Sequence, residues 1–180
     1  MRLRFLGFTF AAGLCVAISG GSALSAPPLD LANPQAGPVA TGEYAPGTIV
    51  IRTGARTLTH YRSEGPTMYR IGVGRPGFQW YGTHYVDRKA EWPGWTPPKQ
   101  MLRRQPYLPR YMAGGPENPL GARALYLGGP QGDSGYRIHG TNDPESIGTA
   151  ASSGCFRMMN EDVIKLFDHT SIGTKVVVLP

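Results

Sequence analysis

The sequence predicts a single, mainly β domain with one or two short helices, and three observations support this fold class. Glycine and proline account for 25 and 17 of the 180 residues, and because both break helices they disfavour a helical bundle. The hydrophobic content of 41% is too high for a disordered chain, and the length allows one ordinary domain. Short β-branched runs separated by turn residues recur along the chain, as expected for antiparallel strands.

Residues 1–25 have the layout of a secretory signal peptide. Two arginines precede an apolar run of 14 residues, Phe5 to Ile18, and small residues follow it. The run is shorter than the roughly 20 residues that cross a bilayer, so we expect cleavage before Ala26. An uncleaved anchor and a lipoprotein attached at Cys15 are the alternatives. The expected location is outside the cytoplasm, in the periplasm or the cell wall.

Cleavage there changes both the charge and the cysteine content. The segment removes two arginines and no acidic residue, so the net charge falls from +6 to +4. Cys15 leaves with it, and Cys155 remains as a lone cysteine in an exported domain. A lone thiol forms no internal disulfide, so it is buried and inert, paired between chains, or reactive.

The composition also predicts which ligands the domain lacks. No pair of histidines or cysteines has metal-ligand spacing, and no basic run with interleaved aromatic residues indicates nucleic acid. We therefore expect no metal, no cofactor and no nucleic-acid partner.

The domain is expected over residues 47–180, after a linker rich in Pro, Ala and Gly at residues 26–46. Its β-branched and aromatic runs predict an antiparallel meander at the start and a buried strand at the end. The expected strands are residues 48–52, 57–62, 67–73, 122–127, 136–139 and 175–179. Asn160 is expected to cap a helix whose apolar face consists of Val163, Ile164 and Phe167.

Residues 74–121 show no helical period and contain many prolines. So long a stretch is expected to build a functional surface or to contain unrecognised short strands. Its tryptophans could form a lid, a glycan-contacting face or core contacts; they are Trp80, Trp92 and Trp95.

Cys155 and His139 are the candidates for covalent chemistry. His139 ends a predicted strand, and Cys155 follows 16 positions later in the segment SSGCFR. Thiol catalysis needs a base and donors for the oxyanion, and Gly154 allows backbone amides to point at one. A neighbouring imidazole would lower the pKa of the thiol, and Arg157 could hold a substrate carboxylate. Without further context, such a cysteine is more often a core residue and such a histidine is more often structural.

The stretch from His139 to Arg157, HGTNDPESIGTAASSGCFR, resembles the signature of the L,D-transpeptidase catalytic domain, also called YkuD-like. That signature is a His-Gly pair, a similar spacer, then Ser-His-Gly-Cys, an apolar residue and Arg or Asn. The similarity extends over approximately Gly47 to Pro180, including Asn118–Gly121 before a strand and the ending Ile172–Val176. The resemblance implies a β-sandwich or barrel-like domain.

The resemblance also implies a role for each residue of the motif. Cys155 would be the acyl-accepting nucleophile, and His139 its base and later its acid. The carbonyl of Gly140 would orient the histidine, and the amides of Gly154 and Cys155 would form the oxyanion hole. Arg157 matches the basic position that orders the site or the substrate.

Ser153 departs from the pattern, because many members carry a second histidine there. A hydroxyl can donate a hydrogen bond but does not titrate near neutral pH, so any tuning of the thiol by that histidine is in doubt. The other histidines are expected to be structural or surface residues: His60, His84 and His169.

The implied function is a peptidoglycan L,D-transpeptidase active in cell-wall organisation. Cys155 would attack a stem tetrapeptide, release the terminal D-alanine and pass the acyl group to an amine. The acceptor could be a second stem, giving a 3-3 cross-link, or a lipoprotein or outer-membrane protein; with water, the reaction is that of an L,D-carboxypeptidase. A cell-wall cysteine endopeptidase or amidase is disfavoured because its cysteine usually precedes its histidine. A non-catalytic peptidoglycan-binding module is the remaining alternative.

Overall fold

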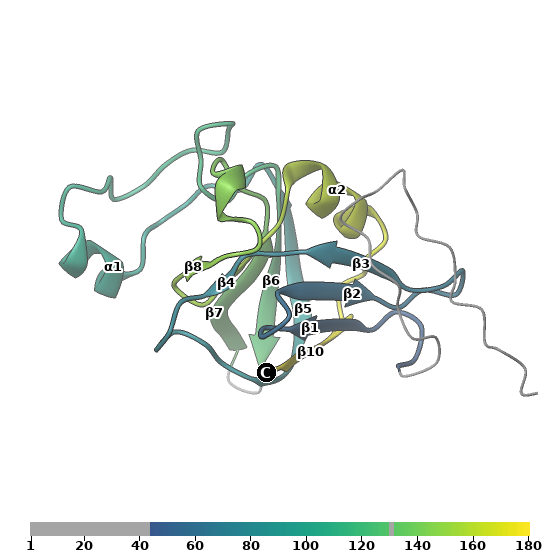
Figure 1. The fold of residues 1–180 in the computed structure, drawn as a ribbon. Helices are drawn as coiled ribbons and strands as arrows, with labels where there is room; N and C mark the ends of the chain where they lie inside the picture. Colours follow the sequence, from purple (N-terminus) through teal and green to yellow (C-terminus); the bar gives the residue numbers. More distant parts are fainter. Residues whose placement is uncertain (1–43, 130–131) are drawn as a thin grey trace, which may run out of the picture.

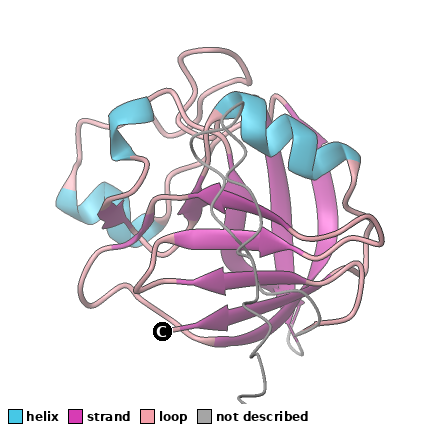
Figure 2. Cartoon of the chain, turned by 45° about the vertical axis from the view of Figure 1, so that its right-hand side comes forward, coloured by secondary structure: helices cyan, strands magenta, loops and turns pink. Residues whose placement is uncertain are grey.

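The computed structural model describes residues 44–129 and 132–180, and its strands form one curled eight-stranded sheet beside a two-stranded one (Figure 1). The larger sheet has the order β3-β2-β1-β10-β5-β6-β7-β9, and the smaller pairs β4 with β8. In Figures 1 and 2 the strands change direction across the larger sheet, so that it curls around the core. The mainly β prediction is confirmed. The predicted signal peptide, Cys15 and nearly all of the predicted linker lie outside the described residues.

The first half of the sheet is the meander that the sequence predicts. Strands β1 (Ile49–Arg52), β2 (Thr57–His60) and β3 (Thr67–Arg70) pair antiparallel in order. The closing strand β10 (Lys175–Leu179) pairs parallel to β1, so the two ends of the domain lie side by side. Alternate side chains of these strands point into the core. The fully buried apolar side chains among them are Ile49, Ile51, Leu58, Val176 and Val178.

A ten-residue strand, β5 (Gly82–Glu91), lies inside the stretch for which the sequence predicted no definite element. It joins the two halves of the sheet, because it pairs with β10 on one side and β6 (Arg123–Gly129) on the other. Only Val86 of this strand is fully buried, and the other residues are half-buried or exposed. The short helix α1 (Lys99–Arg104) buries no residue and lies on an excursion beside the sheet (Figure 1).

The remaining strands form the end of the sheet that carries the motif residues. Strand β7 (Gly132–His139) is longer than predicted and pairs antiparallel with β6. The two-residue strand β9 (Phe156–Arg157) then pairs parallel to the end of β7. Between them lie the 3-10 helix η1 (Pro144–Ser146) and β8 (Ala150–Ser152), which pairs with β4 (Val73–Gly74).

Helix α2 (Asn160–Asp168) covers one end of the core, but its details differ from the prediction. Val163 and Leu166 are the fully buried apolar residues, whereas Ile164 is half-buried. Asn160 does not cap the helix, since the N-cap is Met159 and no side chain makes a capping hydrogen bond. Among the described residues, no helix is long and apolar enough to cross a membrane.

Candidate active site

The pairing of β9 with β7 brings the two halves of the motif together. Ile138 lies beside Phe156, and His139 lies beside Arg157. Because side chains alternate across a strand and both Ile138 and Phe156 are in the core, His139 and Arg157 face the opposite side. Cys155 directly precedes this strand, and it lines the same cavity of about 590 Å³ as His139 and Arg157. Gly135, Arg137, Ser152 and Ser153 complete this part of the wall.

His139 is a buried, neutral base. Its side chain is only 4% exposed, and its Nδ1 lies 2.6 Å from the carbonyl oxygen of Gly140. A carbonyl accepts only, so Nδ1 carries the proton and Nε2 is left as the basic nitrogen. Burial lowers the pKa of His139 to about 4, helped by the positive charges of Arg157 and Arg137 and opposed by the Gly140 hydrogen bond. The contact between His139 and Gly140 is the one that the motif implies.

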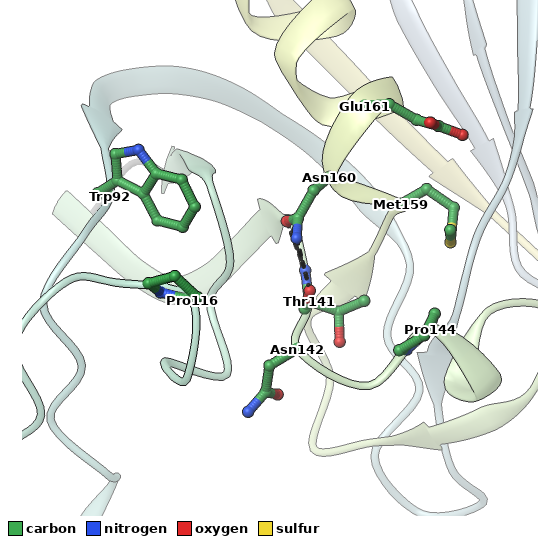
Figure 3. A pocket seen from close by; sticks show the side chains of 8 residues that line it. All are labelled: Trp92, Pro116, Thr141, Asn142, Pro144, Met159, Asn160 and Glu161. Carbon is green, nitrogen blue, oxygen red and sulfur yellow. Dashed lines mark hydrogen bonds between the residues drawn. The ribbon is translucent and has the colours of Figure 1, made fainter.

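The backbone after His139 is fixed by Asn160, which the sequence assigned to a helix cap. Its Oδ1 accepts a hydrogen bond from the amide of Ala122 at 2.9 Å. It also accepts one from the amide of Thr141 at 3.1 Å, and its Nδ2 donates to the Thr141 carbonyl at 2.9 Å (Figure 3). A Cβ on Gly140 would lie 2.2 Å from Asn160 Oδ1, so only glycine fits there. Asn160 therefore holds the carbonyl that orients His139.

A second cavity of about 330 Å³ adjoins this segment (Figure 3). It contains neither Cys155 nor His139, and it therefore lacks the pair that could carry covalent chemistry. Its lining consists of Trp92, Pro116, Thr141, Asn142, Pro144, Met159, Asn160 and Glu161.

Cys155 is a half-buried thiol rather than a stabilised thiolate. Its Sγ lies 4.0 Å from the carbonyl oxygen of Gly135. Burial raises the pKa of Cys155, and the charge and backbone hydrogen bond of Arg137 and the charge of Arg157 offset this only in part. The expectation that the site lowers this pKa is wrong, because His139 is uncharged and the loss of water around the sulfur is the larger effect. The thiol must therefore give up its proton to a base before or as the sulfur attacks.

The turn before Cys155 is held from both sides. Ser152 Oγ donates to the Cys155 carbonyl at 2.6 Å and accepts from the Gly154 amide at 3.1 Å. On the other side, Trp80 Nε1 donates to the Gly154 carbonyl at 2.8 Å. The Gly154 amide, which the motif implies as a donor to the oxyanion, is thus already bonded to Ser152. The Cys155 amide remains the candidate donor.

Trp80 positions that Cys155 amide. The Gly154 carbonyl and the Cys155 N–H belong to one planar peptide group, so fixing the first fixes the direction of the second. The indole is itself stacked on Tyr136, with ring centroids 4.3 Å apart, and packs edge-on against His84.

The three tryptophans therefore differ in their surroundings. The sequence left open a lid, a glycan-contacting face or core contacts for these residues. Trp80 packs against the core. Trp95 lines the larger cavity, and Trp92 is 44% exposed at the second one.

The two remaining motif positions are each tied to another side chain. Ser153 stands where many members of the family carry a second histidine. Its Oγ accepts a hydrogen bond from Nη1 of Arg75 at 3.3 Å. Arg157 forms an ion pair with Asp143 at 3.5 Å. Arg157 therefore lines the cavity, but its guanidinium is already paired with the carboxylate of Asp143.

The other histidines lie outside the wall of the larger cavity. His60 is 2% exposed, and burial and the charge of Arg62 lower its pKa to about 4. His84 lies 3.2 Å from the Gly128 carbonyl, and His169 lies 2.8 Å from the Lys165 carbonyl on the surface. Within residues 44–129 and 132–180, no three acidic, histidine or cysteine side chains gather as metal ligands do.

Comparison with known proteins agrees with the motif. Residues 46–178 match the family model described as the L,D-transpeptidase catalytic domain. The chain is 36% identical over 141 residues to "Probable L,D-transpeptidase ErfK/SrfK" of Escherichia coli (strain K12); the match covers 73% of this chain and 43% of that protein. The chain therefore spans less than half the length of this relative.

Two solved structures extend the comparison. A Brucella melitensis protein named "Probable carnitine operon oxidoreductase caia" is 45% identical, with a TM-score of 0.52 over 78% of this chain and 91% of that one. L,D-transpeptidase 3 from Mycobacterium tuberculosis, in complex with a faropenem-derived adduct, is 16% identical, with a TM-score of 0.53 over 74% of this chain and 60% of that one. The second likeness shows the shared fold. By its family model and its curated relatives, the chain belongs to the L,D-transpeptidase catalytic domain family.

Proposed function

We propose that the protein is a cysteine-dependent peptidoglycan L,D-transpeptidase that forms an acyl-enzyme on Cys155. The observation that carries the proposal is the shared cavity: the Cys155 thiol and a neutral His139 line it together, and Nδ1 of His139 is committed to Gly140. A thiol and an oriented, unprotonated imidazole nitrogen in one cavity are the two groups that nucleophilic catalysis requires.

The reaction follows from these protonation states. His139 Nε2 takes the thiol proton as Sγ attacks the carbonyl between the L-centre of a stem diamino acid and the terminal D-alanine. The Cys155 amide donates to the oxyanion, the C–N bond breaks, and His139 returns the proton to the amine of D-alanine. An acceptor amine then attacks the thioester, loses a proton through His139, and restores the thiol.

The charge of the cavity supports a stem peptide as the substrate. Among the described residues, its wall contains four cationic side chains and no acidic one: Arg88, Lys99, Arg137 and Arg157. Peptidoglycan stems carry several carboxylates, which a cationic, partly enclosed cavity attracts. The β-lactam adduct of the Mycobacterium tuberculosis relative supports the use of a penem or carbapenem as a probe of Cys155.

The acceptor and the location are parts of the same proposal. A second stem as acceptor gives a 3-3 cross-link, a lipoprotein or outer-membrane protein amine gives anchoring, and water gives carboxypeptidase trimming. The apolar N-terminal run with small residues after it supports export to the periplasm or cell wall.

Incubation with tetrapeptide stems, followed by mass spectrometry of the products, tests this function. We expect release of D-alanine and formation of a cross-linked dimer, both lost in Cys155→Ala. Free tripeptide without dimer would assign the enzyme to trimming. Stem binding with no turnover by the wild-type protein would contradict the enzymatic proposal and leave the binding module.

A further inference from the structure

Three side chains from adjacent strands form a stack on the wall of the larger cavity. Arg88 of β5 lies directly opposite Tyr126 of β6, and Tyr126 lies opposite Arg137 of β7. The guanidinium carbon of Arg88 lies 3.4 Å from the centroid of the Tyr126 ring, and that of Arg137 lies 4.8 Å from it. All three residues line the cavity that contains Cys155 and His139.

A bulge in β5 puts Arg88 on this face of the sheet. Val86 pairs with Leu127 and both are buried in the core, yet Arg88 pairs with Tyr126, so the pairing skips Asp87. In a regular strand Val86 and Arg88 would face the same side. Because the extra residue reverses the alternation, the side chain of Arg88 reaches the cavity instead of the core.

Arg88 differs from the other two cavity arginines in its partners. Arg137 forms an ion pair with Asp133 at 3.5 Å, and Arg157 forms one with Asp143 at 3.5 Å. Among the described residues, Arg88 has no carboxylate partner, and its contact is the face of the Tyr126 ring. A guanidinium whose carbon lies over a ring face still has N–H groups that can bind a carboxylate through two hydrogen bonds.

We propose that Arg88, held on Tyr126, binds a free carboxylate of the donor stem close to the scissile bond. The inference rests on the proposed function and adds a carboxylate-binding position to it. Two carboxylates have this chemistry: that of the terminal D-alanine and that at the side-chain end of the diamino acid. Arg137 and Arg157 add positive charge to the cavity, but each already has an aspartate partner, so among the described arginines of the cavity wall Arg88 is the one without a carboxylate partner.

Binding of stem tetrapeptides to the Cys155→Ala protein, measured by isothermal titration calorimetry, tests the inference without turnover. Three peptides are compared: one with both carboxylates free, one with the side-chain carboxylate amidated, and one with the terminal carboxylate amidated. We expect one of the two amidations to weaken binding by about 10- to 100-fold, as for loss of a charged hydrogen-bonded pair. Which amidation does so identifies the carboxylate.

Adding Arg88→Gln to the Cys155→Ala protein should weaken binding of the free peptide by a similar factor and remove the penalty of that amidation. Tyr126→Phe, which keeps the ring, should retain the discrimination, and so should Arg103→Gln, an exposed arginine of α1 outside the cavity wall. Equal weakening of all three peptides by Arg88→Gln would overturn the carboxylate assignment.

The failure of the two proposals is distinguishable. Turnover of stems by the wild-type protein with no discrimination among the three peptides contradicts the role of Arg88 and leaves the transpeptidase proposal intact. Absence of binding to any of the three peptides contradicts both.

Discussion

His139→Ala is expected to slow acylation of Cys155 by about 10²- to 10⁴-fold, the range over which a positioned general base acts. The reason is the protonation state of the site: burial raises the pKa of the thiol, so little thiolate forms without a base. His139 is neutral, its Nδ1 donates to Gly140, and it is the base available in the cavity. Acylation by a carbapenem or a stem peptide, followed by stopped-flow fluorescence or mass spectrometry, measures the rate.

The pH dependence of the wild-type rate provides the matching test. His139 titrates with a pKa of about 4 and Cys155 with a pKa above its ordinary value, so the neutral thiol–imidazole pair persists throughout the range between them. The acylation rate constant should therefore stay level from about pH 5 to pH 8 and fall only as His139 is protonated at lower pH. An acid limb centred between about pH 6 and 7 would contradict the neutral pair. His169→Ala, a surface histidine, should leave both the rate and the profile unchanged.

Gly154→Ala is expected to reduce both stability and acylation. Gly154 has φ = +112°, a conformation that residues with a Cβ rarely adopt. An added Cβ would lie 2.7 Å from Cε1 of Tyr136, whose ring is confined by the stacked Trp80. Backbone strain and steric overlap each cost about 1–3 kcal/mol, so we expect the free energy of unfolding to fall by about 2–6 kcal/mol in urea denaturation. Any relief of the overlap also moves the Cys155 amide.

Trp80→Phe examines the same turn without the strain. The ring stays in the stack, but the hydrogen bond to the Gly154 carbonyl is lost. We expect the unfolding free energy to change by about 1 kcal/mol and the acylation rate to fall by about tenfold. The control is Trp92→Phe, because Trp92 lies at the second cavity. Equal acylation rates for the two variants would show that Trp80 does not position the amide.

The sequence was most informative where a local pattern determines local structure. The β-branched runs between turns correctly predict β1, β2 and β3, and the apolar ending predicts β10. The strand β5 was not identified, because its exposed positions and its bulge at Asp87 remove the alternation that marks a strand. Its pairing depends on β10 and β6, which lie far away along the chain.

For the site as well, the motif predicts some contacts, whereas others depend on how the chain folds. The motif implies the contact of His139 with Gly140 that the structure contains. Four of the residues that it selects line one cavity: His139, Ser153, Cys155 and Arg157. It does not reveal that the Gly154 amide donates a hydrogen bond to Ser152 Oγ. Nor does it reveal that burial raises the pKa of Cys155 by more than the nearby cations lower it. These effects depend on contacts that form only in the folded chain. Asn160 was missed as a site residue because an asparagine before an apolar run also has the pattern of a helix cap.

The central claim is that Cys155 itself carries the acyl group. Its most direct test is the mass of the protein after brief incubation with a stem tetrapeptide and acid quenching, followed by peptide mapping. The account predicts a mass increase equal to the tripeptide acyl group, confined to the fragment containing Cys155 and absent from Cys155→Ala. Release of D-alanine by Cys155→Ala at the wild-type rate, or an acyl group on any other residue, would contradict it.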